Sequence, residues 1–232
     1  MPNKEYVQLK KMFITGIIFA VVTMLGGEMP IGWIVYPEVD NELVSMIIGS
    51  GKLTILQLAL GTFFGGIGIP LQYYGYEAIS RIVEMGGSKK CGKFIHFGAK
   101  AIAFWGAVVH VVCVALMFVC RMEETHTLKQ IPQSVMDFTL WIVLPISAVF
   151  MAIYIPMTIA MMIPVINGKT IFPKWAVIFN PIFYKILLNM ISYIAPNTKL
   201  VNGIRMSNMG LGSLITFVGL LVLLERHKVR EA

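Results

Sequence analysis

Long runs of apolar residues alternate with short polar segments along the chain. A transmembrane helix needs about 20 mostly apolar residues to cross the hydrocarbon core of a bilayer, and six stretches are long enough. They lack the period-two alternation that strands would show. The predicted spans run over residues 10–28, 53–73, 97–120, 138–165, 175–195 and 208–225. The pattern predicts an all-α, polytopic membrane protein, a single domain over residues 1–232 built as a bundle of six transmembrane helices.

The longest segment between two predicted spans, residues 29–51, follows the first of them. Asn41 stands before a short apolar run over residues 42–48. Asparagine is a preferred N-cap because its side-chain oxygen accepts a hydrogen bond from a free N–H of the first turn. We therefore expect a short helix here, with its apolar residues on the membrane interface.

The composition excludes several classes of protein. Hydrophobic residues make up 57% of the chain and charged residues only 13%, about half the charged share of a soluble domain. Such a chain cannot cover a globule with a soluble surface, which excludes an ordinary soluble enzyme and a disordered tail. The net charge of +7 would suggest nucleic acid in a soluble protein, but here the basic residues cluster between apolar runs. We therefore expect no nucleic-acid partner.

The basic residues also orient the predicted spans. Lys and Arg are enriched in cytoplasmic segments of membrane proteins. One side collects both termini and the second and fourth loops, with thirteen Lys and Arg, whereas the other side has five and Lys185 lies inside a span. Both termini are therefore predicted to be cytoplasmic. Lys89, Lys90 and Lys93 of the second loop could also attract anionic membrane lipids, although the topology signal alone accounts for them.

A few polar residues fall within or at the ends of the spans, where an ionisable side chain costs about 2.5–3.5 kcal/mol on insertion scales. His110 and Lys185 lie near predicted midplanes, and Asn189 shares the helical stripe of Lys185. Glu28 ends the first span. Asn180 precedes Pro181, which lacks an N–H and therefore marks a break. These five residues are the candidates for a ligand site.

Gly61 and Gly65 form a G-x-x-x-G pair in the second span. Glycines at this spacing allow another helix backbone to approach closely. The pair predicts tight packing inside the bundle, and it also leaves an oligomer through these two glycines open.

Sequence signatures of known chemistry are missing. The chain has no phosphate-binding G-x-x-x-x-G-K-[ST], no dinucleotide G-x-G-x-x-G, no H-E-x-x-H and no G-x-S-x-G. The four histidines fall at different predicted depths, and the three cysteines form no C-x-x-C pair. We therefore expect no metal site and no cofactor.

Three features together resemble a family of small bacterial six-span membrane proteins of unknown function. One is Gly27-Glu28 at the end of the first span, where relatives often have Gly-Asp, and another is the region around His110. The most specific is the segment 168–175, Gly-Lys-Thr-Ile-Phe-Pro-Lys-Trp, followed by Asn180-Pro181. The resemblance covers the whole chain. It implies six spans in the plasma (inner) membrane of a bacterium, and it implies no activity.

The leading functional hypothesis is that the bundle binds a small amphipathic or lipid-like ligand in a pocket that opens outward. Glu28 and His110 would line this pocket, with Lys185 at depth. An enzyme acting on a lipid could use His110 as acid or base. One alternative is a proton-coupled transporter, in which Glu28, His110, Lys185 and Glu77 would form a path. The other is a structural or partner-binding protein, which predicts a filled core instead of a cavity.

Overall fold

The computed structural model describes residues 1–39, 41–127 and 131–231, and these residues form helices without any strand. Five helices in this part of the chain are long and apolar enough to cross a membrane. They run over Asn3–Gly32, Ile55–Met85, Lys89–Met122, Gln133–Ile166 and Asn208–Glu231. The all-α class predicted from the sequence is therefore confirmed, and the apolar helices are compatible with an integral membrane protein.

Several of these long helices are interrupted by a turn of different geometry. The first comprises α1 (Asn3–Val21), the π-helix η1 (Val22–Glu28) and α2 (Met29–Gly32). The second comprises α4 (Ile55–Leu71) and α5 (Tyr73–Met85). The third is the continuous helix α6 (Lys89–Met122). The fourth comprises α7 (Gln133–Phe138), the π-helix η3 (Thr139–Val143) and α8 (Leu144–Ile166). After them come the 3-10 helix η4 (Lys174–Ile178), α9 (Pro181–Ile194), α10 (Lys199–Met206) and α11 (Asn208–Glu231).

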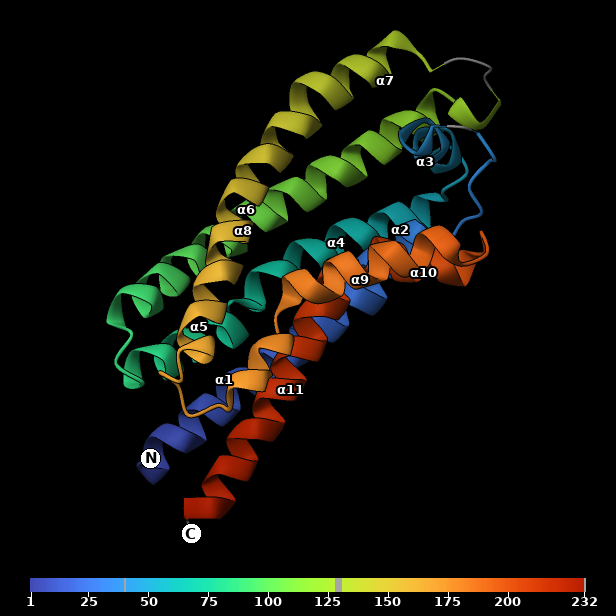
Figure 1. The fold of residues 1–232 in the computed structure, drawn as a ribbon. Helices are drawn as coiled ribbons and strands as arrows, with labels where there is room; N and C mark the ends of the chain where they lie inside the picture. Colours follow the sequence, from blue (N-terminus) through green and yellow to red (C-terminus); the bar gives the residue numbers. More distant parts are fainter. Residues whose placement is uncertain (40, 128–130, 232) are drawn as a thin grey trace.

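Both termini lie at the same end of the bundle (Figure 1). The amino group of Met1 contacts the carboxylate of Glu231 at 2.9 Å, and Tyr6 donates a hydrogen bond to Glu225 at 2.5 Å. These contacts join α1 to α11. On the other side of the bundle, α6 packs against α4, α5 and α8.

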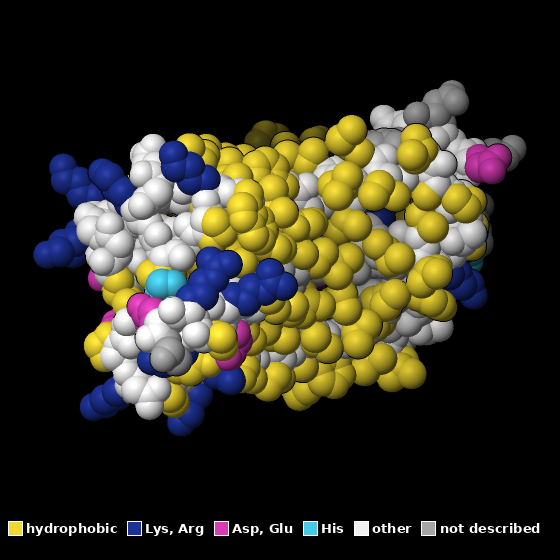
Figure 2. Space-filling view, turned by 60° about the horizontal axis from the view of Figure 1, so that its bottom comes forward, with side chains coloured by type: hydrophobic (Ala, Val, Ile, Leu, Met, Phe, Trp, Pro, Cys, Tyr) yellow, Lys and Arg dark blue, Asp and Glu magenta, His cyan; other side chains and the backbone are white. Residues whose placement is uncertain are grey.

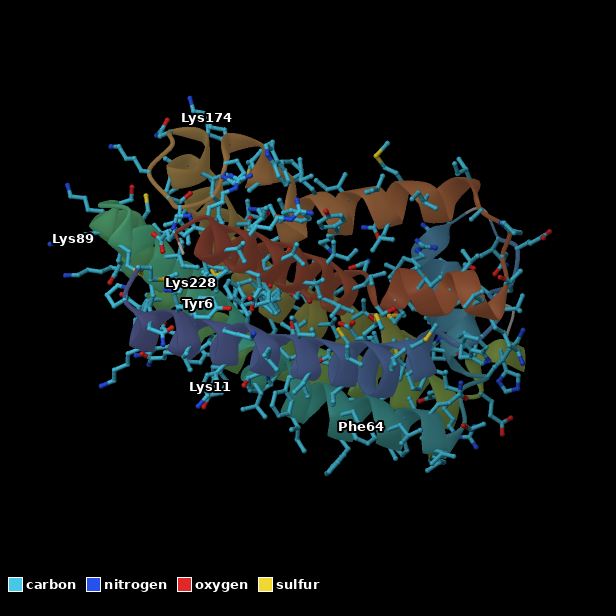
Figure 3. The ribbon with its side chains drawn as sticks, turned by 90° about the horizontal axis from the view of Figure 1, so that it is seen from below. Tyr6, Lys11, Phe64, Lys89, Lys174 and Lys228 are labelled. Atoms are coloured by element: carbon cyan, nitrogen blue, oxygen red, sulfur yellow. The ribbon has the colours of Figure 1, made fainter. Side chains whose placement is uncertain are left out.

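Apolar side chains form a broad belt over the visible face of the molecule, and Lys and Arg gather at one end (Figure 2). Lys89, Lys174 and Lys228 come from three distant segments of the chain, yet they lie at the end that holds the N-terminus (Figure 3). Exposed Phe97, Phe104 and similar large side chains suit contact with lipid tails. These three of the basic residues that the sequence assigned to one side thus lie at one end of the fold.

A sixth spanning helix over residues 175–195 was predicted, and the structure does not confirm it. The 3-10 helix η4 occupies the beginning of this range, and α9 starts only at Pro181, after the N-cap Asn180. The 14 residues of α9 span about 21 Å at 1.5 Å per residue, less than the hydrocarbon core of about 30 Å. Hydropathy counted these residues as one run because the residues around the break are themselves mostly apolar.

The short helix expected after Asn41 is present as α3 (Glu42–Ser50), and the Asn41 side chain accepts a hydrogen bond from the N–H of Val44 at 3.2 Å. Its apolar residues do not all lie on the interface. Ile47 is buried in a small cluster with Cys120 and Val135, because α3 folds back over the end of α6. The 3-10 helix η2 (Thr125–Thr127) follows α6 and lies next to α3.

Candidate functional site

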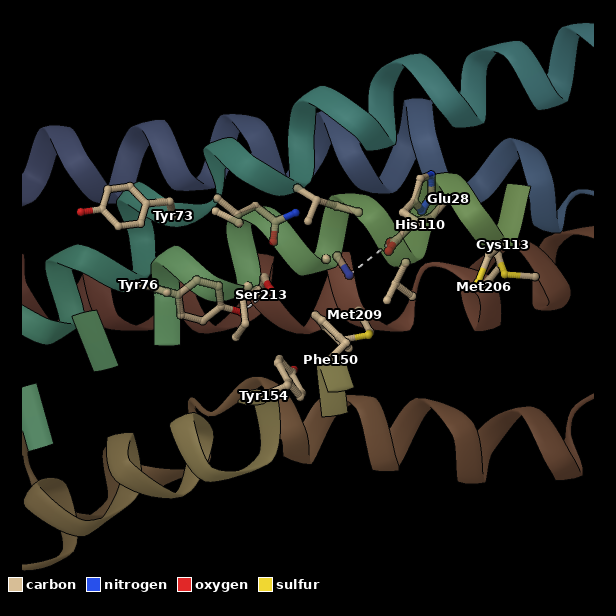
Figure 4. A pocket seen from close by; sticks show the side chains of 18 of the residues that line it. Glu28, Tyr73, Tyr76, His110, Cys113, Phe150, Tyr154, Met206, Met209 and Ser213 are labelled. Carbon is tan, nitrogen blue, oxygen red and sulfur yellow. Dashed lines mark hydrogen bonds between the residues drawn. The ribbon is translucent and has the colours of Figure 1, made fainter. Parts of the chain in front are cut away.

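A cavity of about 160 Å³ lies between α6, α8 and α11, beside the end of η1. We call it the central cavity. Most of its lining is apolar, including Ile102, Met117 and Met209, and its polar groups come from Glu28, Gln72, Tyr73, Tyr76, His110, Tyr154 and Ser213. Figure 4 shows Glu28 and His110 toward one end and Tyr73 and Tyr76 toward the other. An apolar cavity with a few convergent polar groups is the usual form of a small-molecule site.

Glu28 is the last residue of η1, and its side chain is only 7% exposed. Its Oε2 accepts a hydrogen bond from the backbone N–H of Gly210 at 3.1 Å. This N–H belongs to the first turn of α11, which starts after the break at Ser207 and has unpaired N–H groups there. A carboxylate at this helix end is favourably placed relative to the helix dipole. The absence of a side chain at Gly210 matters, because a Cβ atom there would collide with Oε2.

His110 lies halfway along α6 and is buried. Its Nε2 lies 2.9 Å from the carbonyl oxygen of Gly61, and since a carbonyl only accepts, Nε2 carries the proton. The ring occupies the space beside Gly65, where any Cβ would overlap it. The G-x-x-x-G pair is thus used inside the chain: Gly61 also meets Ile31 of α2. The oligomer through these glycines stays a prediction, and its contact surface is already occupied within one molecule.

The sequence analysis missed Tyr154, which lines the central cavity from α8. Its side chain is 1% exposed, and its hydroxyl is buried without a hydrogen-bond partner among the described residues. A buried hydroxyl normally finds a partner. Phe150, one helical turn earlier, stacks on the Tyr154 ring with centroids 5.5 Å apart. The available signal was this i,i+4 aromatic pair, but in an apolar span it reads as ordinary packing.

Tyr76 also lines the cavity, and its hydroxyl is paired. It shares a hydrogen bond of 2.7 Å with the Ser213 hydroxyl of α11. Gln72, at the turn between α4 and α5, donates to Thr23 of η1 at 2.9 Å. These two bonds tie the cavity wall together, whereas Glu28 and Tyr154 keep hydrogen-bonding capacity for something else.

Lys185 and Asn189 do not line the central cavity. Lys185 is half-buried on α9, and the charge of Glu28 acts on it. The two groups form no ion pair within 4 Å among the described residues. Asn189 accepts a hydrogen bond from Asn208 at 2.8 Å, which joins α9 to the start of α11. Lys185 therefore lies outside the lining of the cavity, within electrostatic reach of Glu28.

Asn180 serves the fold at a distance from the cavity. It is 2% exposed. Its Oδ1 accepts from the N–H of Ile182 at 3.1 Å, and its Nδ2 donates to the carbonyl of Thr158 in α8 at 2.8 Å. One side chain thus caps α9 and attaches it to α8.

Glu77 belongs to a separate group at the end of the bundle that holds the termini. Its carboxylate contacts Arg81 Nε at 3.0 Å and His96 Nδ1 at 2.5 Å. This cluster joins α5 to α6, and it does not line the central cavity.

Within the described ranges, no three His, Cys, Asp or Glu side chains lie close enough to hold a metal ion. The three cysteines are free thiols. Cys113 lines the central cavity, whereas Cys91 lies near the start of α6.

Nearly the whole chain matches one family by sequence. The match covers residues 1–227, and the family is described as a family of unknown function, DUF6796. No match to the chain was found among the curated proteins or the solved structures. The resemblance to a family of unknown function, seen in the sequence, is confirmed.

Proposed function

We propose that this chain, which belongs to the DUF6796 family of unknown function, binds a small amphipathic molecule in the central cavity. The observation that carries the proposal is the buried Tyr154 hydroxyl, which has no partner among the described residues and borders the same cavity as Glu28. A buried polar group without a partner costs about 1–3 kcal/mol. A bound molecule that supplies the partner would offset this cost.

The volume of the cavity limits the size of the ligand. An engineered protein cavity of about 150 Å³ holds benzene, so about 160 Å³ suits six to eight non-hydrogen atoms. A lipid-like ligand would have to leave its chains outside. The contacts between α8 and α9 are few, and we propose this seam as the route for such chains. We also propose that the central cavity opens outward, so that a small ligand can enter it.

The first test fills the cavity. Ala103 lines it and Ala115 faces outward on the same helix, so Ala103→Leu and Ala115→Leu add equal volume inside and outside. N-ethylmaleimide labelling of Cys113 and Cys91, read separately by peptide mass spectrometry, reports access. We expect Ala103→Leu to slow labelling of Cys113 at least threefold and to leave Cys91 unchanged, with no effect from Ala115→Leu. Equal labelling of Cys113 in all three proteins would contradict an accessible cavity.

We also propose six crossings in the plasma (inner) membrane, with α9 as a short crossing and both termini in the cytoplasm. Cysteines introduced as Asn41→Cys and His126→Cys should react with a membrane-impermeant maleimide on intact cells. Cys91 should react only after the membrane is opened, because it lies at the basic end of the bundle. Labelling of Cys91 on sealed cells would reverse the orientation.

The two alternative functions are a proton-coupled transporter and a structural protein. For a proton-coupled transporter, Glu77 would have to exchange protons with the cavity while held by Arg81 and His96. For a structural protein, a cavity with a hydroxyl left unpaired by the described residues would have no use. The cavity favours ligand binding over both alternatives. Chemistry at His110 after binding is part of the same proposal.

A further inference from the structure

The polar groups that face the central cavity are mainly hydrogen-bond acceptors. Glu28 uses Oε2 for Gly210, and its Oε1 accepts no hydrogen bond from the described residues. His110 donates through Nε2 to Gly61, so a neutral ring leaves a lone pair on Nδ1. Tyr154 can donate one hydrogen bond and accept others. The fitting ligand is therefore a donor.

The charges around the central cavity also favour a ligand that donates hydrogen bonds. Glu28 is the one carboxylate among the described lining residues, and no Lys or Arg lines the cavity. The first turn of α11 offers the carboxylate a backbone N–H at the cavity wall, and the charge of Lys185 acts on it from outside the lining. A buried carboxylate is stabilised when a cation reaches it and the remaining lone pairs are satisfied. The cavity offers Glu28 no such cation of its own.

Aromatic rings supply the third element. Phe150 and Tyr154 stack on the α8 side, and Tyr73 and Tyr76 line the α5 side. A ring face attracts an organic cation through the negative charge density of its π-system. An apolar cavity with a carboxylate, a hydroxyl and aromatic faces combines the groups that recognise an ammonium ion carrying an apolar body.

We infer that the central cavity takes a small organic ammonium ion of about six to eight non-hydrogen atoms, with its nitrogen on Glu28 and Tyr154 and its apolar part against α6 and Phe150. The inference rests on the proposed function and names the class of its ligand. Lys185 would act as an internal competitor, because its positive charge acts on Glu28 although it does not line the cavity.

Three probes of similar size and different charge test the inference. Benzylamine, benzyl alcohol and benzoate are titrated at pH 8 into the full-length protein in detergent, and binding is measured by calorimetry and by protection of Cys113 from N-ethylmaleimide. We expect benzylamine to bind at least tenfold more tightly than benzyl alcohol, and benzoate to bind most weakly. Cys91 serves as the unprotected reference thiol.

Single substitutions test the contribution of each polar group to binding. Glu28→Gln keeps an oxygen for the N–H of Gly210 and removes the charge, so benzylamine should fall to the affinity of benzyl alcohol. Tyr154→Phe should weaken the binding of benzylamine and of benzyl alcohol by about threefold each. Lys185→Met should tighten benzylamine and leave benzyl alcohol unchanged, because the competing cation is gone. The melting temperature of each variant shows that it is folded.

The outcomes are distinct. Equal binding of all three probes, in wild type and in Lys185→Met, overturns the ammonium inference and leaves the cavity as a neutral ligand site. Preference for benzoate overturns it as well. Failure of every probe to bind or to protect Cys113, in a folded protein, overturns both the inference and the proposed function.

Discussion

Replacing Gly65 with alanine should lower the free energy of unfolding by about 1–3 kcal/mol, the usual cost of overpacking a core. Gly65 lies on the face of α4 that holds the His110 ring, and an added Cβ would overlap that ring. Gly27 of η1 approaches the Gly65 backbone from another side: a Cβ built on Gly27 would come within 2.7 Å of the Gly65 N atom. The ring therefore has little room to move without losing its bond to Gly61. SDS titration of the protein in mixed micelles, followed by tryptophan fluorescence, measures the change.

The neighbouring Gly66 is the matched control. A Cβ there would meet only Val111, at 3.8 Å, which is ordinary contact, so Gly66→Ala should be neutral or should stabilise α4 by up to about 1 kcal/mol through helix propensity. In Gly65→Ala/His110→Ala the ring is gone, and much of the loss caused by the alanine should disappear. Additive effects of the two changes would show that the ring and Gly65 are not in contact.

Asn180→Ala should cost about 1–3 kcal/mol, because one side chain performs two tasks. Loss of an N-cap costs about 0.5–2 kcal/mol, and the bond from Nδ2 to Thr158 adds about 1 kcal/mol. The bond to Thr158 is buried between α8 and α9, and the cap bond to the N–H of Ile182 is partly buried at the start of α9. The effect should exceed that of Thr198→Ala, which removes the cap of α10 at an exposed position. The same SDS titration compares the two.

Asn180→Asp distinguishes the two tasks. The aspartate keeps an oxygen for the N–H of Ile182 and loses the donor to Thr158, and it brings a negative charge toward a carbonyl oxygen. It should therefore be at least as harmful as alanine. If Asn180→Ala is no worse than Thr198→Ala, the attachment of α9 to α8 through this side chain is not a significant part of the stability.

Hydropathy alone determined the helical class and the five longest helices, because a run of apolar residues long enough to cross a bilayer is a local property of the chain. The charge count likewise assigned Lys89, Lys174 and Lys228 to one side, and the fold places them at one end. The short helix after Asn41 followed from one capping residue. The break within the sixth predicted span is local too, since Asn180 and Pro181 set the start of α9 and hydropathy averages over both.

The cavity was decided by tertiary structure. Glu28 and His110 were selected because ionisable groups are rare in spans, but their meeting depends on how η1, α4 and α6 pack around Gly27, Gly61 and Gly65. Lys185, equally conspicuous in the sequence, does not line the cavity, because α9 packs against α11 and contributes none of the described lining residues. Tyr154 has only one local signal, its i,i+4 aromatic pair with Phe150, and in an apolar span this pair is typical of ordinary packing. Its hydroxyl is distinctive only because the described residues around it provide no partner, and the absence of a partner is a property of packing in three dimensions.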